Sequence, residues 1–157
     1  MSLQEIDPRL HTACAQGDLV LVKRLLSQGA DVNSTNGFDG WSALHYAAAS
    51  IYCCVEVAKT LIEAGANLNA QSKKGGWTPL HFAAVGAGRL DAAIALLNAG
   101  ADVTLIDAEG RTPFDMSNGS AVREYYESWL AAKAISEAFA SGSVDDKAIT
   151  SKRGLSL

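Results

Sequence analysis

The residues best suited to chemistry in this chain are its three histidines, His11, His45 and His81. Three imidazoles could hold a zinc ion, which takes nitrogen ligands at about 2 Å. Each histidine, however, occupies the same place in a recurring Leu-His-x-Ala pattern and so belongs to a separate, equivalent unit. Units that stack at the helix packing distance of about 8–10 Å hold equivalent histidines too far apart to share one ion. We therefore expect no metal and no cofactor at these positions.

The other candidates for chemistry carry weaker signals. Cys53 and Cys54 are adjacent and lack the Cys-x-x-Cys spacing of a zinc or redox motif, and with Cys14 they are expected to be reduced thiols. Gly86 and Gly88 could suggest a phosphate loop, but the stretch follows an expected helix and lacks the Gly-Lys-Ser/Thr ending. Since the histidines belong to the recurring units, no Ser/His/Asp arrangement can be assembled. The sequence predicts no catalytic residue and no enzyme.

The elements that position the histidines are helices, because each histidine follows a helix start. In Thr78-Pro79-Leu80-His81, Thr78 can cap the helix, and Pro79 loses no hydrogen bond at the first helical position. The pattern recurs at intervals of 34, 36 and 34 residues, with copies that begin at Leu10, Leu44, Leu80 and, in weaker form, Phe114.

A second motif keeps the same period. It is Gly-Ala-Asp/Asn, and it begins at Gly29, Gly65 and Gly100. The two motifs together resemble the ankyrin repeat, whose signature is Thr-Pro-Leu-His-x-Ala at a period of about 33 residues. The resemblance covers roughly residues 5–130. It implies two antiparallel helices per repeat, a hairpin-like finger between repeats, histidines that bond backbone or hydroxyl groups near the fingers, and protein binding as the usual function.

The predicted fold class is therefore all-α, an α-solenoid of ankyrin repeats, in which stacking creates the core that no single unit could form. We divide the chain into a lead-in (1–6), repeat 1 (7–41), repeat 2 (42–77), repeat 3 (78–111), a degenerate capping repeat with an extended helix (112–140) and a flexible tail (141–157). A stripe from Val122 to Leu130 fits one helical face. Because Ile135 and Phe139 are out of phase with Trp129, we expect this helix to break near Ala132 or to cover a second surface.

Composition and charge exclude several classes of function. A net charge of −4 and a pI near 5.3 argue against nucleic-acid binding. No apolar run approaches the length of a membrane span, and the first residues lack the apolar core of a signal peptide. We expect a cytoplasmic or nuclear chain, monomeric on its own, with a protein partner of unknown identity, no nucleic acid and no membrane insertion.

Two tryptophans are the strongest candidates for partner binding. Trp41 and Trp77 directly precede helix caps, and the resemblance places them at the finger bases, toward the concave surface. One repeat apart, they could form an aromatic platform of the kind enriched in interface hot spots. Alternatively, each could pack on its neighbouring finger and stiffen it. The fingers that precede them are one residue longer than the third, which ends at Arg111.

The remaining predicted partner contacts lie at finger tips and in an insertion of repeat 2. The tips differ in charge, and their candidates are Phe38, Asp39, Lys73, Lys74, Glu109 and Arg111. For the two lysines, a solvated loop is the alternative. Ile51 and Tyr52 could extend the binding face or fill a gap made by the insertion. Tyr46 and Phe82 are expected to pack between inner helices.

The sequence thus predicts a non-catalytic protein–protein interaction module that binds its partner on the concave face, through fingers and inner helices. The alternative is a structural or regulatory subunit that docks to an enzyme or larger assembly through the C-terminal capping helix. The first hypothesis predicts that Trp41→Ala combined with Trp77→Ala abolishes partner binding and leaves thermal unfolding nearly unchanged.

Overall fold

Residues 8–50, 55–86, 88–117 and 121–141 are described by the computed structural model, and within them lie eight helices. These are α1 (Pro8–Gln16), α2 (Leu19–Ser27), α3 (Ala43–Ala49), α4 (Val55–Glu63), α5 (Pro79–Val85), α6 (Leu90–Asn98), α7 (Pro113–Met116) and α8 (Ala121–Ala140). The chain divides into two compact units, Met1–Arg123 and Glu124–Leu157. Predicted contacts Ile51 and Tyr52, with Cys53 and Cys54, lie outside the described residues.

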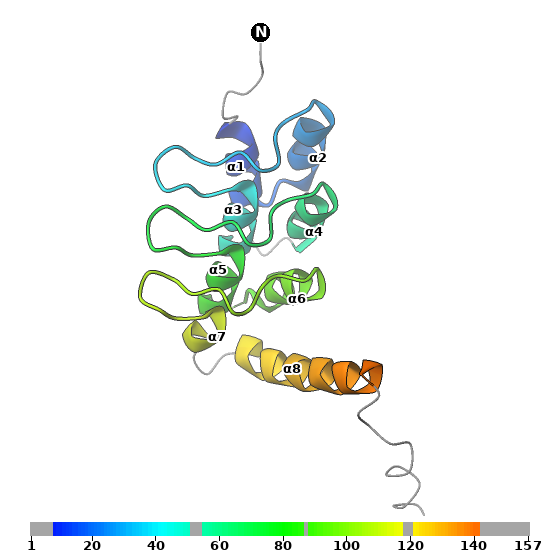
Figure 1. Ribbon diagram of the computed structural model, residues 1–157. Helices are drawn as coiled ribbons and strands as arrows, with labels where there is room; N and C mark the ends of the chain where they lie inside the picture. The colour runs from blue at the N-terminus through cyan, green and yellow to red at the C-terminus, as the bar shows by residue number, and fades with distance from the viewer. Residues whose placement is uncertain (1–7, 51–54, 87, 118–120, 142–157) are drawn as a thin grey trace, which may run out of the picture. The chain divides into compact units, whose positions relative to one another are not determined.

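The first unit is a stack of helix pairs (Figure 1). The inner helices α1, α3, α5 and α7 form one row in which each contacts the next, and the outer helices α2, α4 and α6 form a second row. Loops project from the inner row as three fingers: finger 1 (33–41), finger 2 (69–77) and finger 3 (104–111). In the described residues the β-structure is an isolated bridge between Thr35 and Ser42. The predicted all-α solenoid is confirmed.

The core of the stack is made by the recurring apolar positions. Leu10, Leu44 and Leu80 are all nearly inaccessible to solvent, and so are Leu61 and Leu96 of the outer row. Alanines at the facing positions let neighbouring helices approach closely, since a methyl group fills little space. No single repeat supplies both sides of these contacts, so burial depends on stacking.

Helix α5 begins with a capping box in which histidine takes the place usual for Glu or Gln. The backbone N–H of His81 donates to Thr78 Oγ1, and the backbone N–H of Thr78 donates to His81 Nδ1 at 3.1 Å. In α7 the same box is completed by Asp115, which accepts from the backbone N–H of Thr112 at 2.8 Å. The capping repeat therefore keeps the helix start although it has lost the histidine.

Asparagines at the finger bases link each repeat to the next. Asn33 Oδ1 accepts from the backbone N–H of Asn67 at 2.7 Å, and Asn69 Oδ1 accepts from the backbone N–H of Asp102 at 2.8 Å. Both bonds join residues about one repeat apart. They fix the spacing of the fingers on the outside of the stack.

Helix α8 decides between the two alternatives for the end of the capping repeat. It continues to Ala140 as one extended helix, so the alternative of a break near Ala132 is excluded. Four alanines between residues 131 and 138 favour a helix, and neither Gly nor Pro interrupts it. Ile135 and Phe139 lie four residues apart on a face of this helix that is exposed to solvent. None of the described helices is long and apolar enough to cross a membrane.

Candidate binding surface

The histidines are structural ties between repeats. The Nε2–H of His45 donates to the carbonyl oxygen of Trp77 at 3.0 Å, and that of His81 donates to the carbonyl oxygen of Arg111 at 3.1 Å. His11 Nε2 bonds the carbonyl oxygen of Ser34 at 2.9 Å. The inner helices α1, α3 and α5 are thereby each tied to the finger that follows them, which confirms the role expected for these residues.

Burial favours the neutral form of two of these side chains. It lowers the pKa of His45 and of His81, because an imidazolium loses its hydration when it is removed from water. In the described part of the chain, no three His, Cys, Asp or Glu side chains gather in a way that could hold a metal ion. Cys14 is buried, and burial raises its pKa to about 12, so its thiol is protonated and inert.

Trp41 and Trp77 both pack on one ring, that of Phe82 in α5. The centroid of Trp41 lies 4.4 Å from that of Phe82, and the centroid of Trp77 lies 4.9 Å from it, both edge to face. Phe82 is nearly buried, whereas the two tryptophans remain half-buried. Each tryptophan residue therefore keeps part of its surface in solvent while its ring contacts a buried phenyl ring.

These contacts extend in both directions along the stack. Trp41 also contacts Tyr46 of α3 at 5.2 Å, and Tyr46 lies 5.3 Å from the ring of His11. At the other end Trp77 stacks on His81 at 6.4 Å. The result is a continuous row of rings that crosses three inner helices, and we name it the aromatic strip: His11, Tyr46, Trp41, Phe82, Trp77 and His81.

The tryptophan rings contact an inner helix. Each tryptophan packs on an inner helix, so its contact is with Phe82 and not only with a finger. Tyr46 and Phe82 lie between inner-helix elements as expected. They also belong to the same row of rings, which spacing along the sequence did not reveal.

All three fingers share one hydrogen-bond frame, in which a backbone N–H donates to the carbonyl of the finger's last residue. The N–H of Asn36 donates to Trp41, that of Ser72 to Trp77 and that of Asp107 to Arg111, at 2.8, 2.8 and 2.9 Å. The first two frames enclose one residue more than the third. The predicted difference in finger length is confirmed, and Arg111 is the positional equivalent of the two tryptophans.

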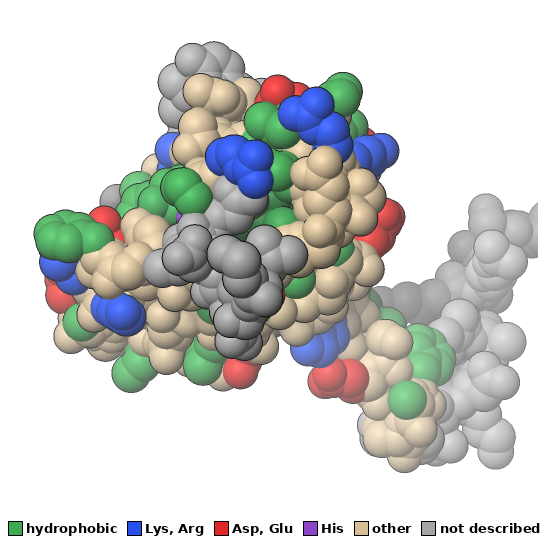
Figure 2. Space-filling view, turned by 90° about the horizontal axis from the view of Figure 1, so that it is seen from above, with side chains coloured by type: hydrophobic (Ala, Val, Ile, Leu, Met, Phe, Trp, Pro, Cys, Tyr) green, Lys and Arg blue, Asp and Glu red, His purple; other side chains and the backbone are tan. Residues whose placement is uncertain are grey.

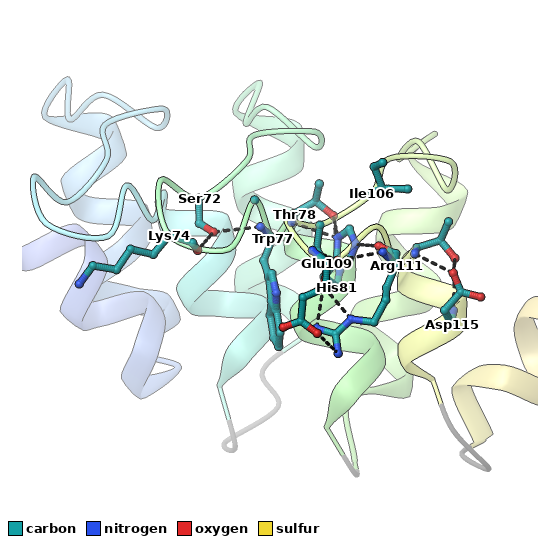
Figure 3. Close-up of polar contacts among 12 residues, drawn as sticks. Ser72, Lys74, Trp77, Thr78, His81, Ile106, Glu109, Arg111 and Asp115 are labelled. Carbon is teal, nitrogen blue, oxygen red and sulfur yellow. Dashed lines mark hydrogen bonds and ion pairs between the residues drawn. The ribbon is translucent and has the colours of Figure 1, made fainter.

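Arg111 forms ion pairs with two carboxylates of finger 3. Its Nε and Nη2 donate to Asp107 Oδ2 at 3.0 and 2.8 Å, and its Nη1 lies 2.8 Å from a carboxylate oxygen of Glu109. Figure 3 shows the side chains of Glu109 and Arg111 joined to each other. Glu109 and Arg111 were both predicted as partner contacts, and the structure pairs them with each other.

The tips of fingers 1 and 2 are joined to each other. Lys74 Nζ lies 3.7 Å from the centroid of the Phe38 ring and 3.3 Å from a carboxylate oxygen of Asp39. The backbone N–H of Lys73 donates to the carbonyl of Asp39 at 2.8 Å. Gly40, at a φ of +71°, lets Lys73 approach to where a Cβ would stand. Four predicted contacts thus form one cluster.

The finger edge also presents apolar side chains to solvent. Phe38 is 75% exposed although Lys74 covers one ring face. Figure 2, seen from above, shows hydrophobic, basic and acidic side chains gathered at this edge. Ile106 of finger 3 is 53% exposed and was missed. The available signal was an apolar residue directly before the finger's turn, at Asp107.

A hollow opens beside the N-terminal end of the strip. Its volume is about 370 Å³, and its wall is mostly apolar. Pro8 and His11 of α1, Asn36 and Gly37 of finger 1 and Tyr46 of α3 contribute to it. The strip is therefore bordered by a space large enough for a small ring.

Comparison with known proteins agrees with this architecture. The sequence profile described as ankyrin repeats (3 copies) matches residues 10–113, which is more than half of the chain. The chain belongs to the ankyrin-repeat family. Mouse and human ankyrin repeat domain-containing protein 40 are each 46% identical to it over 44 residues, which is 28% of this chain and 12% of the relative. The match thus spans only about an eighth of those proteins. Ankyrin repeats are generally protein–protein interaction modules.

Proposed function

We propose that this ankyrin-repeat chain is a non-catalytic interaction module, which binds a partner protein on the face formed by the fingers and inner helices. The aromatic strip carries this proposal. Trp41 and Trp77 keep part of their indole rings in solvent while Phe82 holds them in place, so little rotamer entropy remains to be lost on binding. Aromatic anchors of this kind dominate the energy of protein interfaces.

The buried histidines and the buried Asp107 are hydrogen-bonded within the protein, which supports binding over catalysis. His45 and His81 are engaged with finger carbonyls, and Asp107 is engaged with Arg111. A general acid or base needs a proton that substrate can reach. The same proposal takes the chain to be monomeric on its own and places it in the cytoplasm or nucleus, with a protein partner.

The test is to replace both tryptophans by alanine and to compare partner binding with wild type. Proteins captured by the immobilised chain are identified, and the strongest candidate is purified and titrated. We expect the double variant to lose at least about a hundredfold in affinity, since each hot-spot aromatic contributes upwards of 2 kcal/mol. Trp129→Ala, in α8, is the matched control and should bind as wild type.

The structure changes one part of the sequence-based expectation for this variant. Thermal unfolding should not stay nearly unchanged, because Phe82 loses two ring contacts when both tryptophans are removed. If the alanine variant fails to fold, Trp41→Leu and Trp77→Leu keep an apolar contact with Phe82 and carry the test. A folded variant with wild-type affinity would refute the proposal.

A second candidate function rests on α8. Leu130, Ile135 and Phe139 are 39%, 58% and 54% exposed on this helix, and Ile135 and Phe139 share a face. Exposed apolar groups favour a docking surface for a structural or regulatory subunit. Replacement of Ile135 and Phe139 by serine should abolish partner binding under this alternative, with the Trp41 and Trp77 variants unaffected. The opposite pattern favours the aromatic strip.

A further inference from the structure

Hydrogen-bond donors without an acceptor in the described part of the chain lie along the aromatic strip. Within the described residues, neither the indole N–H of Trp41 nor that of Trp77 has an acceptor, and no buried side-chain nitrogen or oxygen lacks a partner, so both N–H groups reach solvent. The hydroxyl of Tyr46 accepts from Asn36 Nδ2 at 2.7 Å, which leaves its own O–H free to donate. Three donors thus line one row of rings.

The acceptors of the first two finger frames already accept hydrogen bonds. The carbonyls of Trp41 and Trp77 close the finger frames, and the carbonyl of Trp77 also accepts from His45. Asn36 Oδ1 accepts from the backbone N–H groups of Asp39 and Trp41. A ligand that covers the strip must therefore supply acceptors, and any N–H groups of its own would be buried without partners, at a cost of about 1–3 kcal/mol each.

Proline is the residue whose backbone meets this requirement. It has a carbonyl oxygen but no N–H, and consecutive prolines form the polyproline II helix, whose carbonyls are not bonded internally. Aromatic-lined grooves are the surfaces that bind such segments, since the helix is preformed and loses little entropy.

The spacing of the tryptophans fits the same ligand. Because Phe82 lies 4.4 Å from one indole and 4.9 Å from the other, the two indoles can be at most about 9 Å apart, the distance expected for stacked helices. Polyproline II rises about 3.1 Å per residue with three residues per turn, so its equivalent residues also recur about every 9 Å. Each turn would present the same face to successive tryptophans.

We propose that the aromatic strip binds a proline-rich segment of a partner protein in the polyproline II conformation. The segment runs along the stack, the N–H groups of Trp41 and Trp77 and the O–H of Tyr46 donate to its carbonyls, and a prolyl ring enters the hollow beside Tyr46. This inference rests on the proposed function, since it names the partner class of the same surface.

The test uses the full ¹⁵N-labelled chain and an oligoproline peptide of about three turns. The chain has three tryptophans, so the indole N–H signals of Trp41 and Trp77 report on the strip, and that of Trp129 is an internal reference. We expect the first two signals to shift downfield in a saturable manner and the third to stay in place. A Gly-Ser peptide of equal length has the same carbonyls but flexible backbone and free N–H groups, and should cause no saturable shift.

Replacement of the tryptophans by phenylalanine separates the contribution of the indole N–H to binding from that of the aromatic ring. Trp41→Phe and Trp77→Phe retain an aromatic contact with Phe82 and remove only the N–H and the second ring. Each should weaken oligoproline binding about fivefold, the loss expected for one hydrogen bond. Trp129→Phe is the matched control and should leave the affinity unchanged. Thermal unfolding of each variant checks that the fold is kept.

Three results would overturn the inference: no shift of the strip signals at millimolar oligoproline, an equal response to the Gly-Ser peptide, or wild-type affinity in both phenylalanine variants. Its failure is distinguishable from failure of the proposed function. A purified partner that depends on Trp41 and Trp77, combined with no response to oligoproline, refutes only the partner class. Loss of neither kind of binding in the Trp41 and Trp77 variants refutes both.

Discussion

Fingers 2 and 3 share the same backbone hydrogen-bond frame but close it with different kinds of side chain. In finger 2, Ser72 and Trp77 close the frame with a neutral hydroxyl that accepts from the backbone N–H at 3.0 Å, and the indole ring faces Phe82. In finger 3, Asp107 and Arg111 close it with a buried carboxylate and a guanidinium. Finger 2 leaves an aromatic ring partly exposed, whereas in finger 3 the carboxylate and the guanidinium pair with each other.

The extra residue of finger 2 accompanies this difference. Gly75 and Gly76 have φ angles of +83° and +64°, whereas finger 3 makes its turn with Gly110 alone. A Cβ on Gly75 would stand 3.2 Å from the Trp77 ring. The longer, glycine-rich turn therefore accommodates the indole, and loop length and tryptophan belong together. The comparison teaches that an open aromatic face and a closed ion-pair network can be built on one frame.

The largest expected effect comes from removing the acceptor that closes each finger. Asp107→Ala should lower the free energy of unfolding more than Ser72→Ala, because Asp107 accepts from two backbone N–H groups and from the guanidinium. The Ser72 change should cost about 1 kcal/mol, the value of one ordinary hydrogen bond. Urea unfolding measures both. Asp107→Asn keeps an acceptor for the backbone and should be intermediate; equal losses for the two alanine variants would contradict the comparison.

Acid should weaken the histidine ties and the Asp107 frame of finger 3 in separate pH windows. Burial holds the pKa of His45 and His81 below 6.5, so the unfolded chain binds more protons in mild acid. The contribution of these two histidines to the free energy of unfolding is then fully present above about pH 7.5, and it falls as the pH drops below 6.5. Burial of Asp107 disfavours its charge, but the bonds from Arg111 and the backbone outweigh burial and hold its pKa below 3.8. Its contribution is lost only below that value.

Unfolding free energies measured from pH 8 to pH 3 test these windows. His45→Gln should reduce the upper one, to which His81 still contributes, and leave the lower one in place. Asp107→Asn should leave the upper one in place and flatten the lower one. A stability that rose between pH 7 and pH 5 would contradict the assignment to buried neutral histidines.

The smallest effect is expected at the finger tips. Lys74 lies over Phe38 and pairs with Asp39, but its side chain is 63% exposed, so water and salt screen the pair. Lys74→Ala should cost no more than about 0.5 kcal/mol in urea unfolding. The backbone bond from Lys73 to Asp39 continues to join the tips. A loss as large as that of Ser72→Ala would mean that the tip cluster stabilises the stack.

The fold could be predicted from local signals that recur. Thr78 and Pro79 mark a helix start by their own chemistry, and the period of Leu-His-x-Ala shows that the starts are equivalent. The histidine ties were expected from the resemblance to the ankyrin repeat, and they agree with the rule that a buried imidazole needs a hydrogen-bond partner. These features depend on residues close in sequence, or on their repetition.

The ring contacts of the candidate site could not be predicted in the same way. Trp41 and Phe82 are separated by a whole repeat, and their contact depends on how one helix stacks on the next. The pairing of Asp39 with Lys74 also depends on the approach of two fingers. Periodicity alone left open whether α8 breaks near Ala132, and the helix propensity of its alanines accounts for its continuation.

The asparagine links at the finger bases have a consequence for how such a chain can change in length. Asn33 bonds the carbonyl of Gly65 and the amide of Asn67, and Asn69 bonds the amide of Asp102, so each link involves two adjacent repeats. Repeat 2 carries both the receiving amide, on Asn67, and the asparagine of the next link, Asn69, so a whole repeat of this kind can be duplicated or deleted and a link remains at every junction. Gene-level gain or loss of one unit would thus leave a complete stack, whereas insertion of part of a repeat between Asn33 and Asn67 would break the link that joins them.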